Sequence, residues 1–371
     1  MKKTKVAILG CTGLVGREFV RLLDGHPWFA IACLTASPRS AGRRFAETDP
    51  PGPDGNGSAG RLVVRETAAA AVVASGARVV FSALPAAAAG PLEAELRAAG
   101  LRVFSNAGAH RMDPDVPLLV PEANGEHLEL ARRQLHCHAG FIVTNPNCVV
   151  SGLALALKPL MGLVPRAVTV TTFQAVSGGG RRGVAAWDIL GNVVPFIAGE
   201  EEKVGRETRK ILGAFSAAGV RPDAMEVYPS CARVAVRDGH LQSVGVEFAR
   251  PVDGDAAAAA LAGFSAEPQR LRLPTAPSRP IVVRPEPDRP QPRLDLRAGT
   301  AIPAGRSRPG EAGGRDRAAG MAVSVGRLRP QGKRLDFFLL VHNTVRGAAG
   351  GSLLNAELAA RKGLIPGVPR G

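Results

Sequence analysis

Hydrophobic positions in the first 147 residues come in short runs that alternate with amphipathic stretches. The runs predict β-strands at residues 5–10, 30–34, 78–84 and 101–105. The stretches between them predict helices, most clearly at residues 19–23 and 91–100. This alternation favours an α/β fold with a parallel, doubly wound sheet of the Rossmann type.

The second half of the chain has a different pattern. A helical run at residues 151–160 leads into segments rich in valine, threonine and phenylalanine. These segments predict strands at residues 167–175, 234–236, 241–248, 321–328 and 335–342, with the second and third paired. We therefore expect an α+β domain with a mostly antiparallel sheet, and a last helix at residues 347–360 that packs back onto the first half.

These patterns divide the chain into two domains, for which 371 residues are enough. Residues 1–147 are predicted to form the Rossmann domain, completed by a C-terminal helix within residues 346–371. Residues 148–345 are predicted to form the second domain. Residues 50–60 are crowded with proline and glycine and predict a loop. Residues of about 297–319, rich in glycine, arginine and proline, predict a flexible insertion.

The chain is strongly basic, with a formal charge of +15 from 47 basic and 32 acidic residues. Such a charge permits nucleic-acid binding. However, the arginines are dispersed, and the 13 Phe, 2 Trp and 1 Tyr leave few side chains for stacking on bases. We therefore expect small anionic ligands as partners, and no nucleic acid.

No apolar run approaches the roughly 18 residues that a membrane span requires. The run that follows the N-terminal lysines ends at Gly10, which is too early for a signal peptide. We predict a cytoplasmic protein with no membrane partner.

The five cysteines are irregularly spaced and indicate neither a disulfide framework nor a zinc site. His136, Cys137 and His138 lie side by side, but no second cluster completes a four-coordinate site. We predict no metal.

A glycine-rich loop separates the first predicted strand from the first predicted helix. It reads Gly10-Cys11-Thr12-Gly13-Leu14-Val15-Gly16. Glycines at such a junction let the backbone approach a pyrophosphate, whose charge is met by the helix N-terminus. The predicted cofactor contacts in this loop are Gly10, Thr12, Gly13, Leu14, Val15 and Gly16. The alternative is a plain strand–helix turn.

The end of the second predicted strand bears on the choice of cofactor. An acidic residue there is typical of NAD sites, but this chain has none and instead carries Ser37, Arg39 and Ser40. Hydroxyl and guanidinium groups suit a 2′-phosphate. The sequence therefore predicts NADP, with a solvated basic loop as the alternative.

Cys148 follows Asn145-Pro146-Asn147 and immediately precedes a predicted helix. The field of a helix N-terminus lowers the pKa of a thiol, so we expect a reactive thiolate at this position. A buried structural cysteine is the commoner reading of one isolated cysteine. A catalytic role therefore requires partners.

Four motifs occur in one order along the chain. They are the glycine loop, Asn145-Pro146-Asn147-Cys148, Cys231-Ala232-Arg233-Val234 leading to Gly239-His240, and Asn343-Thr344-Val345-Arg346-Gly347. Together they resemble the aspartate-semialdehyde dehydrogenase family. The runs Trp187 to Asn192 and Gly199 to Lys203 resemble its archaeal and fungal branch. The resemblance covers roughly residues 5–360, except for the loops near 45–60 and 297–319.

The resemblance implies an NADP-dependent enzyme that reduces L-aspartyl-4-phosphate to L-aspartate-4-semialdehyde through a cysteine thioester. Such a step belongs to lysine, threonine and methionine biosynthesis. The implied partners are the small-molecule substrate and phosphate, and the implied assembly is a homodimer or homotetramer. The second domain would then be a dimerisation domain as well as a catalytic one.

The same resemblance assigns a role to individual residues. Cys148 matches the nucleophile, His240 the acid/base, and Gln174 the residue that positions the thioester. Arg233 and Glu200 match the groups that hold the substrate carboxylate and amino group, with Glu201 and Glu202 as neighbours that could replace Glu200. The remaining substrate-binding positions are Lys203 and Arg111, which match phosphate-binding residues, and Asn147. Ser177, Gly178 and Asn343 match positions that touch the cofactor.

Two departures from the family pattern bear on the substrate. Arg181 and Arg182 stand where this branch usually has an aromatic residue and a proline, and the insertion after Leu296 lengthens a normally short segment. An acyl-phosphate or acyl-thioester reductase of the N-acetylglutamyl-phosphate or malonyl-CoA type is therefore kept as an alternative. A basic nucleic-acid-binding protein would explain the charge, but not the motifs around Cys148 and His240.

Overall fold

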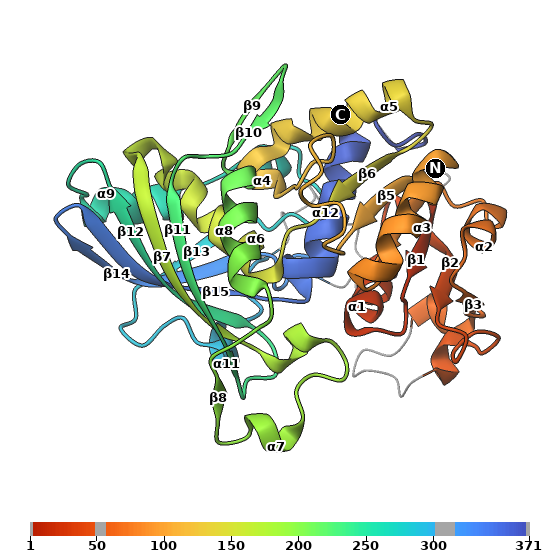
Figure 1. The fold of residues 1–371 in the computed structure, drawn as a ribbon, viewed down its shortest axis with the longest axis horizontal. Coiled ribbons are helices and arrows are strands. Elements are labelled where there is room, and N and C mark those ends of the chain that lie inside the picture. The colour runs from red at the N-terminus through yellow and green to blue at the C-terminus, as the bar shows by residue number, and fades with distance from the viewer. Residues whose placement is uncertain (1–2, 49–56, 301–315, 369–371) are drawn as a thin grey trace, which may run out of the picture.

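The structure, a computed structural model, describes residues 3–48, 57–300 and 316–368. It contains two large sheets, one in the N-terminal part and one in the C-terminal part (Figure 1). None of the helices in the described part is long and apolar enough to cross a membrane.

The first sheet is parallel throughout, with strand order β3-β2-β1-β4-β5-β6. Its strands are β1 (Thr4–Leu9), β2 (Phe29–Ala36), β3 (Arg65–Glu66), β4 (Val79–Ser82), β5 (Arg102–Ser105) and β6 (Phe141–Thr144). The strand order reverses between β1 and β4, where ligands bind in doubly wound sheets. The predicted Rossmann-type sheet is confirmed.

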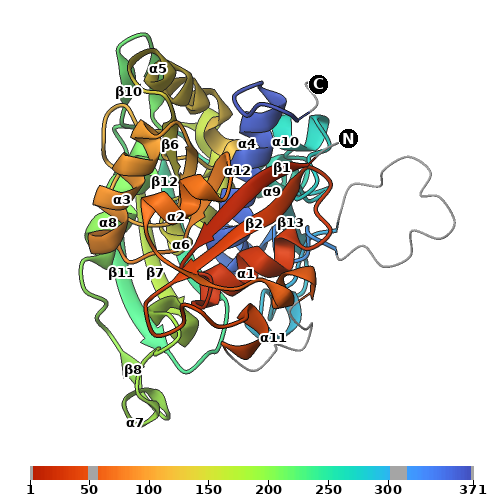
Figure 2. The same cartoon turned by 90° about the vertical axis from the view of Figure 1, so that its right-hand side faces the viewer.

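Helices cover this sheet on both faces, because its strands are apolar on both sides. They are α1 (Leu14–Leu23), α2 (Ala69–Ala74), α3 (Ala86–Ala98), α5 (Glu129–Cys137) and the C-terminal α12 (Gly350–Arg361). The short α4 (Pro121–Asn124) instead contributes Ala123 to the hydrophobic core of the C-terminal sheet. α12 shares a hydrophobic core with β1 and α1 through Leu354 and Leu358, which pack with Val6 and Phe19. The expected return of the last helix to the first half is confirmed (Figure 2).

The second sheet is mixed, with order β13-β14-β15-β12-β7-β11-β8. Its strands are β7 (Pro165–Gln174), β8 (Val193–Val194), β11 (Glu226–Val234), β12 (His240–Phe248), β13 (Ile281–Arg284), β14 (Val323–Gln331) and β15 (Arg334–Val341). All neighbours are antiparallel except β7 with β11 and β13 with β14. The mostly antiparallel sheet is confirmed.

One predicted pairing in this sheet is wrong. Residues 234–236 do not pair with residues 241–248, because β7 lies between β11 and β12 and bonds to both. β7 is ten residues long and offers a full ladder on each side. Those two long ladders replace the short hairpin that closeness in sequence suggested.

Two longer helices lie against the second sheet, α6 (Cys148–Leu157) and α8 (Glu200–Ile211). α6 is buried along nearly its whole length, and Gly152 lets it approach β15, since a Cβ there would lie 2.8 Å from the Cβ of Val341. Short elements complete this half: α7 (Ala186–Ile189), β9 (Ala214–Ser216), β10 (Gly219–Arg221), α9 (Gly254–Ala262), α10 (Glu267–Arg270) and α11 (Pro292–Asp295).

The two predicted loops fall partly outside the described residues. Of the predicted loop at 50–60, residues 57–60 belong to a 3₁₀ turn and residues 50–56 lie outside. Most of the predicted insertion, residues 301–315, lies outside as well. After it, Arg317 donates from Nε to the carbonyl of Leu22 at 2.9 Å, so this flank of the segment contacts α1.

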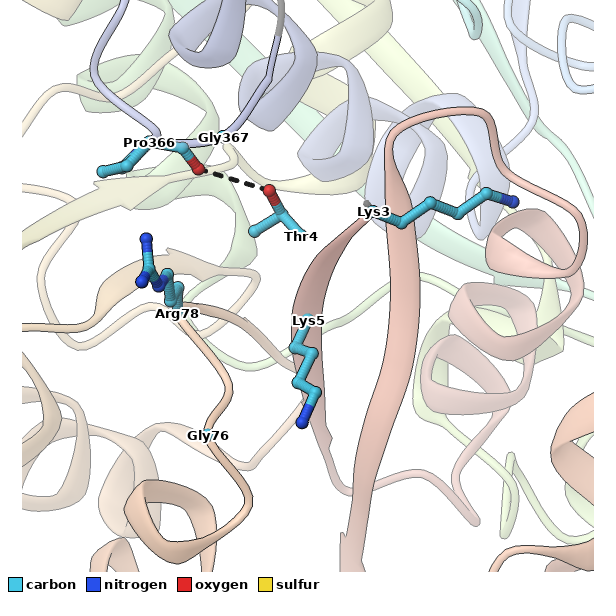
Figure 3. A pocket seen from close by; sticks show the side chains of 7 residues that line it. All are labelled: Lys3, Thr4, Lys5, Gly76, Arg78, Pro366 and Gly367. Atoms are coloured by element: carbon cyan, nitrogen blue, oxygen red, sulfur yellow. Dashed lines mark hydrogen bonds between the residues drawn. The ribbon is translucent and has the colours of Figure 1, made fainter. Parts of the chain in front are cut away.

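The C-terminal residues contact the first sheet at the amino ends of β1 and β4. This edge lies opposite the carboxyl ends of the strands, where ligands bind in doubly wound sheets. Thr4 Oγ1 donates to the carbonyl of Pro366 at 3.3 Å (Figure 3). A cavity of about 340 Å³ lies beside this contact, and Lys3, Lys5 and Arg78 line it. Their side chains point in different directions and do not converge on one point.

Candidate active site

The first residue of α6 is Cys148, and the helix begins directly after β6 through Asn145 and Pro146. Asn147 is the N-cap, and its side-chain oxygen accepts the N–H of Val149 at 2.8 Å. Asn145 donates from Nδ2 to the carbonyl of Gly347 at 3.1 Å. The loop that carries the thiol is therefore fixed from within its own helix and from the turn before α12.

His240 lies opposite the thiol at the start of β12. Its Nε2 is 3.1 Å from Sγ of Cys148. Its Nδ1 accepts the backbone N–H of Ala175 at 3.0 Å. Because a backbone N–H can only donate, Nδ1 carries no proton, and the neutral imidazole holds its proton on Nε2, facing the sulfur.

Burial sets the protonation of both groups. Desolvation raises the pKa of Cys148 to about 12, and the charge of Glu200 adds to this, while Arg111 and Arg233 oppose it. Desolvation lowers the pKa of His240 to about 3, with Arg233 and then His342 contributing. The expected lowering of the thiol pKa is therefore wrong for the protein alone, because burial outweighs the helix N-terminus.

Gln174 and Arg233 lie side by side on neighbouring strands, at paired positions of β7 and β11. Both are buried. Arg233 donates from Nη1 to the carbonyl of Ala175 at 2.9 Å, and Gln174 donates to Oγ1 of Thr172 at 3.2 Å. The structure thus brings both residues to the end of β7 from which Ala175 contacts His240.

Three consecutive acidic residues begin α8, and each has a different environment. Glu200 is buried and accepts from Nδ2 of Asn147 at 2.9 Å. Glu201 accepts the backbone N–H of Cys231, and Glu202 is exposed and pairs with Arg206. Of the three, only Glu200 contacts the residue that caps the helix of Cys148.

Arg111 and Lys203 approach the site from different elements. Arg111 is buried in the loop after β5, donates from Nη2 to the carbonyl of Asn106 at 2.7 Å, and forms an ion pair with Glu207 at 2.9 Å. Lys203 is exposed, one turn along α8 from Glu200. Sequence reasoning missed Glu207. The signal for it was the spacing 200, 203, 207, 210, which places four charged residues on one helix face.

The glycine loop has the geometry of a phosphate cradle. Gly10 has a φ of +73°, and a Cβ there would lie 2.8 Å from the carbonyl oxygen of Ala83. A Cβ at Gly16 would lie 2.1 Å from the Gly10 carbonyl oxygen, so only glycine lets α1 approach this closely. Gly13 is the N-cap of α1 and makes no side-chain hydrogen bond to the helix. A Cβ at Gly13 would meet no atom closer than 3.4 Å. The first N–H groups of α1 are thus open to an anion.

The other predicted loop contacts, Thr12, Leu14 and Val15, are partly exposed beside Gly13. After β2, Ser37 and Arg39 are exposed, whereas Ser40 is buried. β2 lies next to β1, and the N–H of Cys11 donates to the carbonyl of Thr35 at 2.9 Å. The serine and arginine therefore lie on the same edge of the sheet as the glycine loop.

Asn343 connects two segments around the imidazole. Its Nδ2 donates to Oγ of Ser177 at 2.8 Å, and its Oδ1 accepts the N–H of Gly239 at 2.8 Å. Gly178 follows, and a Cβ there would lie 2.6 Å from Nη1 of Arg233 and 3.1 Å from Cε1 of His240. The three positions expected to touch the cofactor therefore border the thiol–imidazole pair.

No group of three or more potential metal ligands occurs within the described ranges. His136 and Cys137 end α5, and His138 follows it.

Comparison with known proteins places the chain in a family. Residues 5–131 match the family model described as the NAD binding domain of semialdehyde dehydrogenase, and residues 157–316 match that of its dimerisation domain. An aspartate-semialdehyde dehydrogenase of Archaeoglobus fulgidus is 44% identical over 97% of this chain and 99% of that protein. The chain belongs to the aspartate-semialdehyde dehydrogenase family. The resemblance inferred from the four motifs is confirmed.

Other members support the same placement. The aspartate-semialdehyde dehydrogenase of Schizosaccharomyces pombe is 41% identical over 97% of this chain and 99% of that protein. The crystal structure of the Candida albicans enzyme with NADP superposes with a TM-score of 0.83 at 36% identity, covering 98% of this chain and 100% of that one. A Vibrio cholerae aspartate-semialdehyde dehydrogenase shares the fold, with a TM-score of 0.73 at 24% identity over 97% of this chain and 99% of that one.

Proposed function

We propose that the protein is an NADP-dependent aspartate-semialdehyde dehydrogenase, which interconverts L-aspartyl-4-phosphate and L-aspartate-4-semialdehyde. The observation that carries this is the thiol of Cys148 at the start of α6, 3.1 Å from the His240 imidazole. Buried groups of both charges, Glu200 and Arg233, lie beside this pair. Full-length similarity to named members of the family supports the same substrate.

The first sheet fits NADP. Gly10 and Gly16 form a cradle that any side chain would fill, and α1 presents free N–H groups to a pyrophosphate. Ser37 and Arg39 are exposed beside it, where they can bind a 2′-phosphate. The related Candida albicans enzyme was crystallised with NADP. When bound, the nicotinamide donates or accepts the hydride of the reaction.

Cys148 supplies the nucleophile. As the thiolate, it attacks the carbonyl carbon of the acyl phosphate, and the phosphate departs with the electron pair of the broken C–O bond. The product of this half-reaction is a thioester on Cys148. Because burial and Glu200 hold the pKa of the thiol high, Arg111 and Arg233 are the groups that favour the thiolate.

His240 is assigned to the carbonyl oxygen of the substrate. Its Nε2–H faces the reacting centre, because the N–H of Ala175 occupies Nδ1. When negative charge develops on the carbonyl oxygen, Nε2–H donates a hydrogen bond to it, and the imidazole stays neutral. As the C–S bond breaks, the oxyanion re-forms the carbonyl group, which releases the aldehyde and the thiolate. Gln174, buried at the end of β7, is assigned to positioning the thioester.

The substrate-binding groups sort by charge. Arg233 is assigned to the substrate carboxylate, since its Nη1 is held by Ala175 next to the imidazole. Glu200 is assigned to the amino group, with Asn147 bonded to it. Arg111 and Lys203 are assigned to the phosphate. The Nε of Arg111 is buried without a hydrogen-bond partner among the residues that the structure describes, which is unusual for a guanidinium N–H.

We also propose that the chain works as a homodimer or a homotetramer, with residues 1–147 and α12 as the cofactor domain and residues 148–345 as the catalytic and dimerisation domain. The arm of residues 186–196 contains α7 and the edge strand β8, and it projects beyond the rest of the second sheet (Figures 1 and 2). Trp187, Leu190 and Phe196 in this arm are 95%, 70% and 71% exposed. Apolar side chains this exposed are typical of a subunit contact, and the matched family model is named a dimerisation domain.

Light scattering tests the assembly. The wild type is expected to be a dimer or tetramer at micromolar concentration, and Trp187→Ala with Phe196→Ala is expected to shift it toward monomer. A wild-type monomer would contradict the proposal. The five free cysteines fit a reducing compartment such as the cytoplasm. The proposed reaction fits lysine, threonine and methionine biosynthesis.

A substrate panel followed by NADPH absorbance tests the activity. We expect NADP reduction with L-aspartate-4-semialdehyde that depends on added phosphate, and none with Cys148→Ala. Rapid oxidation of NADPH by malonyl-CoA, with no response to aspartate-4-semialdehyde, would show that the substrate is wrong. Comparing NADP with NAD and aspartate-semialdehyde with succinate semialdehyde defines both ends of the site.

A further inference from the structure

Helix α8 begins at Glu200, which is assigned to the substrate. Its later turns contact other residues of the proposed site. Its residues 200, 203, 207 and 210 share one face. Glu200 and Lys203 have proposed contacts with substrate. Glu207 and Lys210 lie further along the face, and both are buried. Neither has a part in the reaction described above.

Glu207 uses both carboxylate oxygens. Oε1 accepts from Nη1 of Arg111 at 2.9 Å, and Oε2 accepts the backbone N–H of Asn147 at 2.6 Å. One carboxylate thus connects the arginine assigned to phosphate with the residue immediately before the nucleophile. Charge-assisted bonds of this length are among the strongest in proteins.

Lys210, the next of these four residues along α8, holds the loop that carries Arg111. Its Nζ donates to the carbonyls of Arg111, Asp113 and Val116 at 2.7, 2.8 and 3.0 Å. The loop after β5 is therefore fixed to α8 through its backbone. Burial lowers the pKa of Lys210 to about 8, and nearby acidic residues limit that shift.

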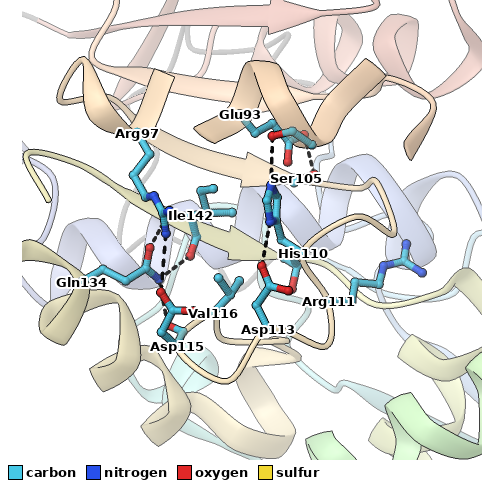
Figure 4. A network of polar contacts seen from close by, with 12 residues as sticks. Glu93, Arg97, Ser105, His110, Arg111, Asp113, Asp115, Val116, Gln134 and Ile142 are labelled. Atoms are coloured by element: carbon cyan, nitrogen blue, oxygen red, sulfur yellow. Dashed lines mark hydrogen bonds and ion pairs between the residues drawn. The ribbon is translucent and has the colours of Figure 1, made fainter. Parts of the chain in front are cut away.

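The rest of this loop is held from the side of the first sheet (Figure 4). Ser105 donates to Glu93 at 2.7 Å, and Nδ1 of His110 lies 2.8 Å from Oδ2 of Asp113. In the same view, Arg111 points away from these contacts. The loop backbone is fixed by other groups, so the direction of the Arg111 side chain depends on Glu207 and on the carbonyl of Asn106.

We propose that Glu207 is a positioning residue for this reaction: it orients Arg111 for the substrate phosphate and fixes the backbone of Asn147 beside the nucleophile. Glu207 binds Nη1 and the carbonyl of Asn106 binds Nη2, so two sides of the guanidinium are held, while Nε has no partner among the described residues. This inference rests on the proposed function, because it takes the assignment of Arg111 to phosphate from it.

A double-mutant cycle tests the coupling, with Glu207→Gln, Arg111→Gln and the double variant. Initial rates of NADPH formation are measured against phosphate concentration. Glu207→Gln is expected to raise the KM for phosphate about tenfold or more, the scale of one lost charge-assisted bond. In the Arg111→Gln background, the same change is expected to raise the KM for phosphate by less than about a further twofold, because Glu207 acts on phosphate binding through Arg111.

Two further variants complete the design. Glu207→Asp keeps the charge but withdraws it by one methylene, so its KM for phosphate should lie between those of the wild type and Glu207→Gln. It replaces Glu207→Gln if the latter does not fold. Glu129→Gln, on α5, removes an exposed acid that pairs with Arg132, and it is expected to leave the kinetics unchanged.

A readout that needs no turnover separates this inference from the proposed function. Inorganic phosphate is expected to protect Cys148 from iodoacetamide, as measured by the mass of the peptide that contains it. The phosphate concentration for half protection should rise in Glu207→Gln in parallel with the KM. If the wild type oxidises no aldehyde but the protection still shifts, the proposed function fails and the role of Glu207 stands. Folded Glu207→Gln with unchanged KM and protection, or independent effects of the two changes on the KM for phosphate, would overturn the role of Glu207.

Discussion

The substitution Gly178→Ala adds one Cβ atom, which should lower catalytic activity and leave the free energy of unfolding nearly unchanged. A Cβ at Gly178 would lie 2.6 Å from Nη1 of Arg233 and 3.1 Å from Cε1 of His240, whereas ordinary contact begins at 3.4 Å. To lie 3.4 Å from this Cβ instead of 2.6 Å, the Nη1 atom of Arg233 would have to move by about 0.8 Å. Its 2.9 Å bond to the carbonyl of Ala175 would then lengthen beyond hydrogen-bond range.

A displacement of this size at a reacting centre costs about 100-fold in rate, or about 2.7 kcal/mol of activation free energy. We therefore expect kcat/KM for L-aspartate-4-semialdehyde to fall about 100-fold in Gly178→Ala. The free energy of unfolding should change by less than about 1 kcal/mol, because the clash is with a side chain and the backbone at Gly178 is not left-handed.

The neighbouring glycine provides the matched control. A Cβ at Gly179 meets nothing within 4 Å, so Gly179→Ala should keep wild-type activity. The assay is NADPH absorbance with urea unfolding of the same samples. Equal activity of the two alanine variants would refute the placement of Arg233 and His240 around Gly178.

Three further predictions follow from the same site. The rate at which iodoacetamide alkylates Cys148, measured from the mass of its peptide, should rise about tenfold per pH unit from pH 7 to 10. The reason is that the raised pKa keeps the thiolate a small fraction of the cysteine over this range. A plateau of the rate near neutral pH would instead indicate a preformed ion pair with His240. Glu200→Gln should accelerate this alkylation, since Glu200 raises the pKa of the thiol. The same change should lower kcat/KM for aspartate-semialdehyde about tenfold relative to that for succinate semialdehyde. Equal losses of kcat/KM for both aldehydes would make Glu200 a structural acid. Arg39→Ala should raise the KM for NADP about tenfold with little effect on that for NAD, and unchanged preference would remove Arg39 from the 2′-phosphate site.

The sequence was sufficient for the parts of the fold that depend on local pattern. Apolar runs followed by helices predicted the parallel sheet, and Gly10 and Gly16 marked the cradle because no other residue fits there. The order of β7, β11 and β12 was not predictable in this way. Strand order depends on which long ladders form between distant segments, and a short loop such as that between Val234 and His240 imitates a hairpin.

The chemistry of the site was predictable by residue type, and its electrostatics were not. The position of Cys148 at a helix N-terminus favoured a low pKa, but the pKa depends on burial and on Glu200, which is distant in sequence. Likewise, Glu207 resembles any helix-surface acid until its contacts with Arg111 and Asn147 are known. Only the spacing along α8 hinted at its position.

The covalent step on Cys148 offers the most direct test of the account. The protein is incubated with L-aspartate-4-semialdehyde and NADP in the absence of phosphate, quenched in acid, and analysed by peptide mass. We predict one aspartyl group on the peptide that contains Cys148, lost within a turnover when phosphate is added, and no such adduct in Cys148→Ala. Sustained aldehyde oxidation with no adduct on Cys148, or an adduct on another cysteine, would contradict the thioester mechanism.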